Sequence, residues 1–257
     1  SYNSQATLTQ HEPFGKKWQF SYATYLVTDP GGTVTIFMPD GRRDVYSPDG
    51  SGGYTRPYRV YNTLRKLADN SFELRLLDDT TYRYGRPAGT TTNQALLRYI
   101  CDPYNQCLSF GYDASVRLTT ITDALNRVTT LSYNAAGFVS TVRDPFGRSA
   151  SFDYANGSLT KITDMGGYWT ELAYDANVYL ASLTNPRGTW GFYVEPADEI
   201  PNNSNPYPAP GGVMWDNYRI TVTNPEGGKE EYYYDAYHSY YDANAVNAWY
   251  VSPRDYR

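Results

Sequence analysis

The sequence predicts an all-β fold, in which short β-hairpins follow one another in an array. Composition supports this class, because the 257 residues include 28 Tyr, 21 Gly and 16 Pro but only 3 Met. Aromatic side chains suit half-buried strands, whereas Gly and Pro occupy turns. The second observation is a sequence pattern that recurs every 20 or 21 residues.

The repeat is anchored on an acidic or amide residue that opens a turn. The anchors are Asp102, Asp123, Asp144, Asp164 and Asn185. Aliphatic residues stand five and two positions before each anchor, and Gly or Asn stands three positions after it. Gly and Asn accept the positive φ of a tight turn, so each unit is predicted to be one hairpin. The two aliphatic positions are three apart, so either a β-bulge separates them or both faces of the strand are covered.

A tyrosine stands ten positions after four of the anchors, and a leucine or aromatic residue stands eight positions after all five. The tyrosines are Tyr112, Tyr133, Tyr154 and Tyr174. Both positions are expected on one face, because alternate residues of a strand point to the same side. We expect the four tyrosines to form a row on successive hairpins, with neighbours roughly 5–10 Å apart.

Four segments are predicted along the chain. Residues 1–96 form an N-terminal region with irregular hairpins, and residues 97–194 hold the five regular repeats. Residues 195–217 are rich in Pro and Asn and are expected to form a surface insertion that interrupts the array without breaking the sheet. Residues 218–257 carry a further hairpin and a C-terminal segment. The chain starts at Ser1 rather than Met, and we expect it to be a piece of a longer protein.

Several segments resemble the YD repeat of bacterial RHS proteins. They include residues 111–113 (Gly-Tyr-Asp), 118–123 (Leu-Thr-Thr-Ile-Thr-Asp) and 144–148 (Asp-Pro-Phe-Gly-Arg), and residues 14–18 (Phe-Gly-Lys-Lys-Trp) are similar to the stretch before such arrays. The resemblance implies that the array forms a curved, spiralling sheet, like the wall of a shell or solenoid. In relatives this hollow shell houses a toxin or serves as an adhesion stalk. No segment matches the family's C-terminal core motif, so neither self-cleavage nor a toxin domain is expected in these residues.

The chemistry of the sequence favours a structural role. A formal net charge of -5 disfavours nucleic acid as a partner, and no apolar run approaches the roughly 20 residues of a membrane span. The chain has two His, far apart, so we predict no catalytic residue, no metal site and no cofactor. We expect a non-catalytic shell or scaffold segment of a bacterial protein, secreted or at the cell surface. Its partners would be the rest of its own longer chain or neighbouring copies.

An alternative function is glycan binding on an exposed aromatic face. Trp169 and Trp190 both stand five positions after an anchor, and aromatic rings on a sheet can stack on sugars. The competing interpretation is that the aromatic residues form ladders between neighbouring strands, which stabilise the sheet by roughly 0.2–1 kcal/mol for each pair. The sequence favours the ladders and leaves glycan binding as an adhesive alternative.

The two cysteines flank one of the turns. Cys101 stands one residue before Asp102 and Cys107 five residues after it. The same two positions flank every anchor, so they should face each other across the hairpin, at a distance that a disulfide accepts. A disulfide is therefore predicted, and it would agree with an extracytoplasmic location. Two free thiols are the alternative.

Overall fold

The structure is a computed structural model that describes residue 2 and residues 13–88, 94–196 and 218–234. All regular secondary structure in these residues is β-strand, in nineteen strands with antiparallel pairing. The predicted all-β class is confirmed. Strands of two to nine residues and tight turns follow from a sequence in which β-branched and aromatic residues alternate with Asp, Asn and Gly.

The chain forms two compact units, residues 1–169 and 170–257. The strands of the first unit are β1 (Tyr25–Thr28), β2 (Val34–Phe37), β3 (Arg43–Pro48), β4 (Tyr54–Thr55), β5 (Thr63–Lys66), β6 (Phe72–Arg75), β7 (Thr81–Gly85), β8 (Ala95–Cys101), β9 (Cys107–Tyr112), β10 (Leu118–Thr122), β11 (Val128–Tyr133), β12 (Val139–Arg143), β13 (Ser149–Ala155) and β14 (Ser158–Thr163). The second unit holds β15 (Trp169–Tyr174), which begins at the boundary, β16 (Leu180–Asn185), β17 (Gly188–Pro196), β18 (Tyr218–Thr223) and β19 (Lys229–Tyr234). The limits of the four segments stay a prediction.

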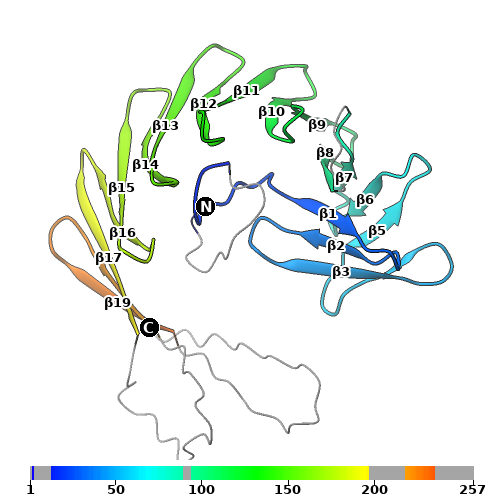
Figure 1. Ribbon diagram of the computed structural model, residues 1–257, viewed down its shortest axis with the longest axis horizontal. Helices are drawn as coiled ribbons and strands as arrows, with labels where there is room; N and C mark the ends of the chain where they lie inside the picture. Colours follow the sequence, from blue (N-terminus) through cyan, green and yellow to red (C-terminus); the bar gives the residue numbers. More distant parts are fainter. Residues whose placement is uncertain (1, 3–12, 89–93, 197–217, 235–257) are drawn as a thin grey trace, which may run out of the picture. The chain divides into compact units, whose positions relative to one another are not determined.

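Strand β8 connects the two parts of the first unit (Figure 1). Near its end Cys101 pairs with Cys107 of β9, whereas near its start Leu96 pairs with Tyr25 of β1. Strands β1, β2 and β3 form one ladder, and β5 to β8 form another. Their inward side chains share one hydrophobic cluster with the first repeats. It includes Leu26, Val34, Ile36, Tyr46, Leu64, Phe72, Leu74, Tyr84, Leu97, Phe110 and Leu118.

A β-bulge recurs four residues before every anchor. Thr119 is the bulged residue of β10, because Leu118 pairs with Tyr112 and Thr120 with Gly111. The equivalent residues are Arg98, Ser140, Thr160 and Ala181. The extra residue brings the two aliphatic positions, three apart in sequence, to the same face. The bulge therefore decides the alternative that the sequence left open.

The first residue of each turn closes it with its side chain. In the turn at Asp123, Oδ1 accepts hydrogen bonds from the backbone N–H groups of Leu125 and Arg127, both at 2.9 Å. The backbone N–H of Arg127 thereby lowers the pKa of the Asp123 carboxyl. Equivalent side-chain bonds occur in the turns at Asp102, Asp113, Asn134, Asp144, Asp164 and Asp175. The predicted positive φ values are confirmed at Asn105, Asn126, Gly147, Gly167 and Gly188.

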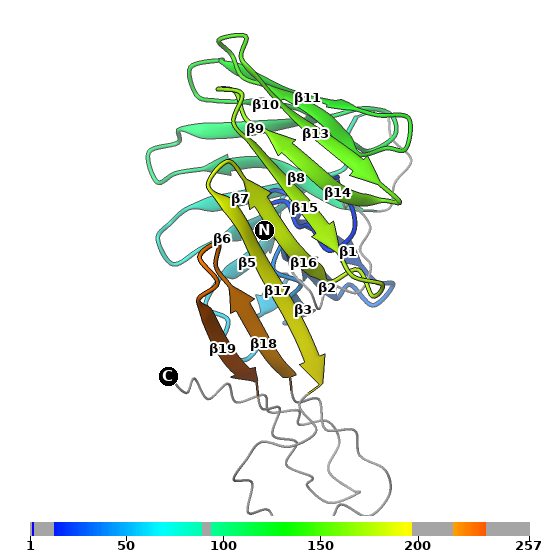
Figure 2. The same ribbon diagram turned by 90° about the vertical axis from the view of Figure 1, so that its left-hand side faces the viewer.

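In the second unit, β17 and β18 pair directly although residues 197–217 separate them. The pairs run from Gly191 with Thr223 to Pro196 with Tyr218. The ladder continues to β19, and Figure 2 shows β15 to β19 side by side. The sheet of this unit therefore continues across residues 197–217. Of the predicted insertion 195–217, Glu195 and Pro196 belong to β17, and residues 197–217 lie outside the described residues.

Candidate functional site

The candidate site is the inner face of the first unit's repeats, together with the N-terminal stretch that lies on it. Residues 13–24, named here the inner segment, form no extended strand and precede β1. In Figure 1 this dark blue stretch lies on the concave side of the hairpins from β9 to β14. The sequence analysis noted residues 14–18 only as a stretch that precedes the array.

Two backbone hydrogen bonds attach the inner segment to the repeats. The N–H of Val139 donates to the carbonyl oxygen of Pro13 at 2.7 Å, and the N–H of Lys16 donates to the carbonyl oxygen of Gly157 at 2.9 Å. Gly15 makes this approach sterically feasible. Its φ is +84°, and a Cβ at this position would lie 2.7 Å from the carbonyl oxygen of Gly157. The local backbone therefore requires glycine for two independent reasons.

Aromatic side chains continue the attachment. The ring of Phe14 lies 5.0 Å from the ring of Phe152 on β13, and 5.3 Å from that of Phe20. Phe20 contacts Tyr22 at 5.3 Å, and Tyr22 contacts Phe110 on β9 at 4.9 Å. The tilted and edge-on geometries are those that aromatic pairs prefer, each worth roughly 0.5–1.5 kcal/mol beyond burial. The inner segment thus spans from one repeat to another two repeats away.

The repeat tyrosines join the two strands of each hairpin at the end remote from the anchor turn. Tyr133 donates its hydroxyl hydrogen to the carbonyl oxygen of Leu118 at 2.7 Å. Equivalent bonds join Tyr112 to Leu97 at 2.8 Å and Tyr154 to Val139 at 2.7 Å. In each case the accepting carbonyl belongs to the residue just before the bulge. The backbone pairing with the next strand does not reach this residue, because it consists of only three residue pairs next to the turn. The tyrosines therefore replace missing backbone bonds, a role that the sequence analysis did not predict.

Burial marks these tyrosines as structural. It raises the pKa of Tyr133 to about 12, with a further increase from the negative charge of Asp113. Burial also raises the pKa of Tyr112. Equivalent hydrogen bonds place Tyr112, Tyr133 and Tyr154 at equivalent positions of successive repeats. The expected distance between neighbours, and the place of Tyr174 in the row, stay predictions.

A cavity of about 240 Å³ lies between the inner segment and the repeats. Its lining includes Phe20, Tyr22, Thr24, Tyr112, Arg117 and Tyr133. The guanidinium of Arg117 is ion-paired with Asp113 at 2.8 Å and lies 4.8 Å from the centroid of the Tyr133 ring. The charge in this lining is already paired, so the cavity is built for packing.

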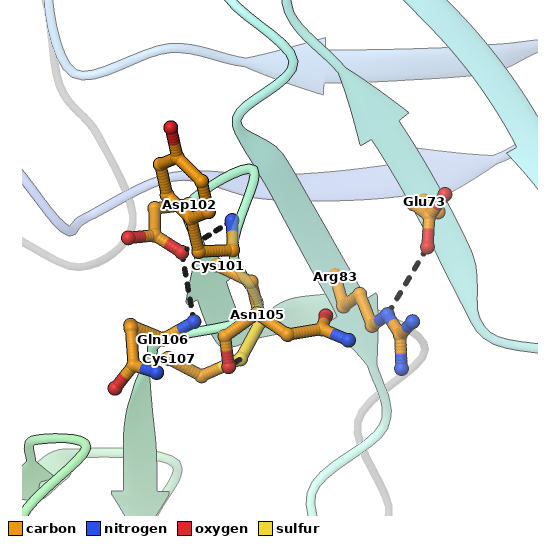
Figure 3. The surroundings of a disulfide bond; sticks show 8 residues. Glu73, Arg83, Cys101, Asp102, Asn105, Gln106 and Cys107 are labelled. Carbon is orange, nitrogen blue, oxygen red and sulfur yellow. Dashed lines mark hydrogen bonds and ion pairs between the residues drawn. A yellow bond between two sulfur atoms is a disulfide. The ribbon is translucent and has the colours of Figure 1, made fainter.

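The two cysteines are joined by a disulfide across the turn at Asp102 (Figure 3). Cys101 and Cys107 are directly paired residues of β8 and β9, with their Cα atoms 4.1 Å apart. Between them, Oδ1 of Asp102 accepts the backbone N–H of Gln106 at 2.8 Å. The same hairpin is thus closed by both a covalent bond and a side-chain hydrogen bond. Nearby, Arg83 of β7 is ion-paired with Glu73 of β6 at 3.1 Å.

The two tryptophans do not occupy equivalent positions. Trp169 is half-buried, with Nζ of Lys161 lying 5.2 Å from the ring centroid. At Asn185 the turn is one residue shorter than in the other repeats, because Asn185 pairs directly with Gly188. Trp190 consequently pairs with Leu183.

The expectation that the two tryptophans stand at equivalent positions of their repeats is therefore wrong for Trp190. In the regular repeats the residue five positions after the anchor pairs with the residue just before it, as Val128 does with Thr122. The shorter turn moves Trp190 by one position along its strand, which places its side chain on the other face. Glycan stacking by either tryptophan stays a prediction.

Comparison with known protein families matches residues 112–149 to the RHS repeat, over the end of β9, the whole of β10 to β12 and the turns between them. The chain contains an RHS repeat. No curated protein matches this RHS-repeat chain.

The family match agrees with the geometry of the site. RHS repeats are structural modules of larger chains, and proteins that contain them are generally extracellular or associated with the cell surface. The match indicates no catalytic family. Within the described parts of this RHS-repeat chain, no group of three or more His, Cys, Asp or Glu is placed to hold a metal ion. The same residues include no helix that could cross a membrane.

Replacing Tyr133 by Phe tests the tyrosine bond between the two strands of a hairpin. The variant Tyr133→Phe keeps the ring but leaves the carbonyl of Leu118 without its donor, and we expect a loss of about 0.5–1.5 kcal/mol in the free energy of unfolding. Urea denaturation of both proteins measures it. Tyr168→Phe is the matched control, because the Tyr168 side chain is 74% exposed. Equal stability of all three proteins would contradict the role assigned to the hydroxyl.

High pH should unfold the array. The folded state holds the Tyr133 and Tyr46 protons up to a pKa of about 12, above the ordinary value of 10.0. Their contribution to stability is therefore complete below pH 10 and lost as the pH rises from 10 towards 12. Thermal unfolding and phenolate absorbance should be followed together through this pH range. We expect the protein to lose its fold at the same pH at which the buried tyrosines ionise. Complete tyrosine ionisation near pH 10 with the fold intact would contradict this.

The disulfide predicts a simple change in mass. The intact protein, measured in denaturant before and after reduction, should gain the mass of two hydrogen atoms, because only the bond between Cys101 and Cys107 is reduced. Alkylation before reduction should leave both cysteines unmodified. If both thiols are alkylated without reduction, the protein as isolated has no disulfide.

Proposed function

We propose that this RHS-repeat chain is a segment of a structural wall that encloses or presents another part of the same longer protein, outside the bacterial cytoplasm. The observation that carries the proposal is the inner segment. The concave face from β9 to β14 already holds a non-repeat stretch of the same chain, through two backbone hydrogen bonds and a line of aromatic contacts. A surface that binds its own chain in this way is suited to cover more of it.

The chemistry of the inner face supports a structural role. A catalytic site needs groups that occur once, whereas this face repeats the same leucine, phenylalanine and tyrosine positions in each hairpin. The tyrosine hydroxyls are engaged with carbonyl oxygens of the preceding strand of the same hairpin, and Arg117 is engaged with Asp113. The polar groups of the face thus hold the array together. The partners proposed for the wall are the rest of its own chain or neighbouring copies.

Protease protection of the inner segment tests the proposal. Trypsin cleaves after Lys16 and Lys17, and both peptide bonds should be cut slowly while the segment is held against the repeats. Gly15→Ala should accelerate this cut about tenfold, the effect of about 1.4 kcal/mol, because the new Cβ meets the carbonyl oxygen of Gly157. Mass spectrometry of timed samples locates the first cut.

Gly167→Ala is the matched control. Gly167 has the same φ of +84°, but no atom lies within 4 Å of an added Cβ. Both variants therefore carry similar backbone strain, and only Gly15→Ala disturbs the inner segment. Equal cleavage rates in the two variants, or cleavage of the unmodified protein as fast as that of the denatured chain, would refute shielding by the wall.

A further inference from the structure

The turn between β13 and β14 consists of Asn156 and Gly157, which join the paired residues Ala155 and Ser158. The φ values are +53° at Asn156 and +80° at Gly157. A two-residue hairpin loop with positive φ at both positions is a type I′ turn, for which Asn-Gly is the preferred dipeptide. The turn therefore explains why these two residues stand here, and the dipeptide occurs once in the chain.

The same dipeptide places an amide and a backbone nitrogen where they can react with each other. Asn is among the chemically labile residues of proteins, because its side-chain amide carbon can be attacked by the nitrogen of the next residue. The side chain of Asn156 is exposed to water. The N–H of Gly157, at the tip of the turn, donates no hydrogen bond to the described residues, and glycine has no side chain that would shield this nitrogen.

In the anchor turns the corresponding nitrogen is protected. Asn105 and Asn126 also have a positive φ, but the next residues are Gln106 and Arg127. The N–H groups of Gln106 and Arg127 are hydrogen-bonded to the anchoring carboxylates, at 2.8 and 2.9 Å. A nitrogen that is held in this way and flanked by a long side chain is a poor nucleophile, so Asn156 stands apart from these asparagines.

The turn at Asn156 is also a point of attachment for the inner segment. The carbonyl oxygen of Gly157 accepts the N–H of Lys16 at 2.9 Å, and Gly15 fits against the same oxygen. The side chain of Lys16 passes over the turn, since a Cβ added to Gly157 would lie 3.2 Å from Cε of Lys16. A change in the main chain at this turn therefore acts directly on residues 15 and 16.

We propose that Asn156 deamidates spontaneously in the folded protein and that the isoaspartate product loosens the inner segment. The Gly157 nitrogen forms a bond to Cγ of Asn156, the side-chain amide group leaves with the proton of Gly157 as ammonia, and a cyclic succinimide remains. Water then opens one of the two C–N bonds of the ring. Opening at Cγ gives aspartate, whereas opening at the main-chain carbonyl of residue 156 gives isoaspartate. The reaction consumes only water.

The two products differ in their effect on the turn. Isoaspartate adds one methylene group to the main chain between residues 156 and 157. The length of a hairpin loop sets the register of its strands, so the longer loop displaces Gly157 and its carbonyl from Lys16. Aspartate leaves the main chain unchanged and keeps the acceptor. The attachment would therefore weaken irreversibly as a molecule ages, whatever the wall encloses.

Ageing of the purified protein at mildly alkaline pH tests both steps. Peptide mapping by mass spectrometry should show that Asn156 exchanges its NH₂ for OH before Asn105 or Asn126 does, and labelling by an isoaspartyl methyltransferase should measure the isoaspartate. Brief trypsin treatment then separates chains cut after Lys16 from uncut chains. We expect molecules with isoaspartate at residue 156 to be cut about tenfold faster than unmodified molecules.

Two variants serve as matched controls. Asn156→Gly has no amide to react and accepts the φ of +53°, and Asn156→Asp carries the other product in an unchanged main chain. Both should fold as the unmodified protein does in thermal unfolding, and aged Asn156→Gly should be cut after Lys16 as slowly as fresh protein. Retention of the Asn156 amide while Asn105 or Asn126 reacts would overturn the proposal. So would equal cutting of isoaspartate and unmodified molecules, or equal acceleration in aged Asn156→Gly.

Discussion

The structure of the repeats depends on how the backbone carbonyl beside each bulge obtains a hydrogen bond. A β-bulge ends regular pairing with the next strand, and a carbonyl left without a partner in a half-buried sheet is costly. In this protein the hydroxyl of a tyrosine, fifteen residues further along, donates to that carbonyl in three successive repeats. The bulge turns both aliphatic positions of the strand to the inner face, and the tyrosine closes the gap that the bulge opens. The inner core, and the surface on which the inner segment lies, depend on this pair of features.

In the turns, too, a side chain accepts hydrogen bonds from backbone N–H groups that have no backbone partner. Each anchoring Asp accepts N–H groups from residues two and four positions later, so a tight turn is closed without a longer loop. At Asp123 and Asp144 the arginine four positions later also pairs with the second carboxylate oxygen. These ion pairs are exposed and contribute little by themselves. Their value is geometric, since they hold neighbouring turns in one shape and keep the hairpins in register.

Much of the repeat could be predicted from the sequence, because its period fixes which residues share a turn, a strand and a face. The positive φ at Asn105 and Gly147 followed from residue type, and the pairing of Cys101 with Cys107 followed from their positions around Asp102. In the sequence the bulge was indicated only by two aliphatic positions three residues apart, which a regular strand would place on opposite faces. Trp190 was misplaced because Asn185-Pro-Arg-Gly shortens its turn by one residue, and no spacing within a single repeat reveals that. The docking of Phe14 depends on a contact between distant segments, for which a local pattern holds no signal.

The position of the inner segment has a consequence for the order in which the protein can mature. Gly15 leaves the ribosome long before Gly157, whose carbonyl oxygen it fits against. Hairpins with mostly neighbouring contacts can form as they emerge, whereas this long-range contact must wait. Until β13 and β14 exist, the rings of Phe14 and Phe20 have no complete binding surface and are open to chaperones, to proteases or to another nascent chain. The inner segment thus reports whether the hairpins made after it have been completed.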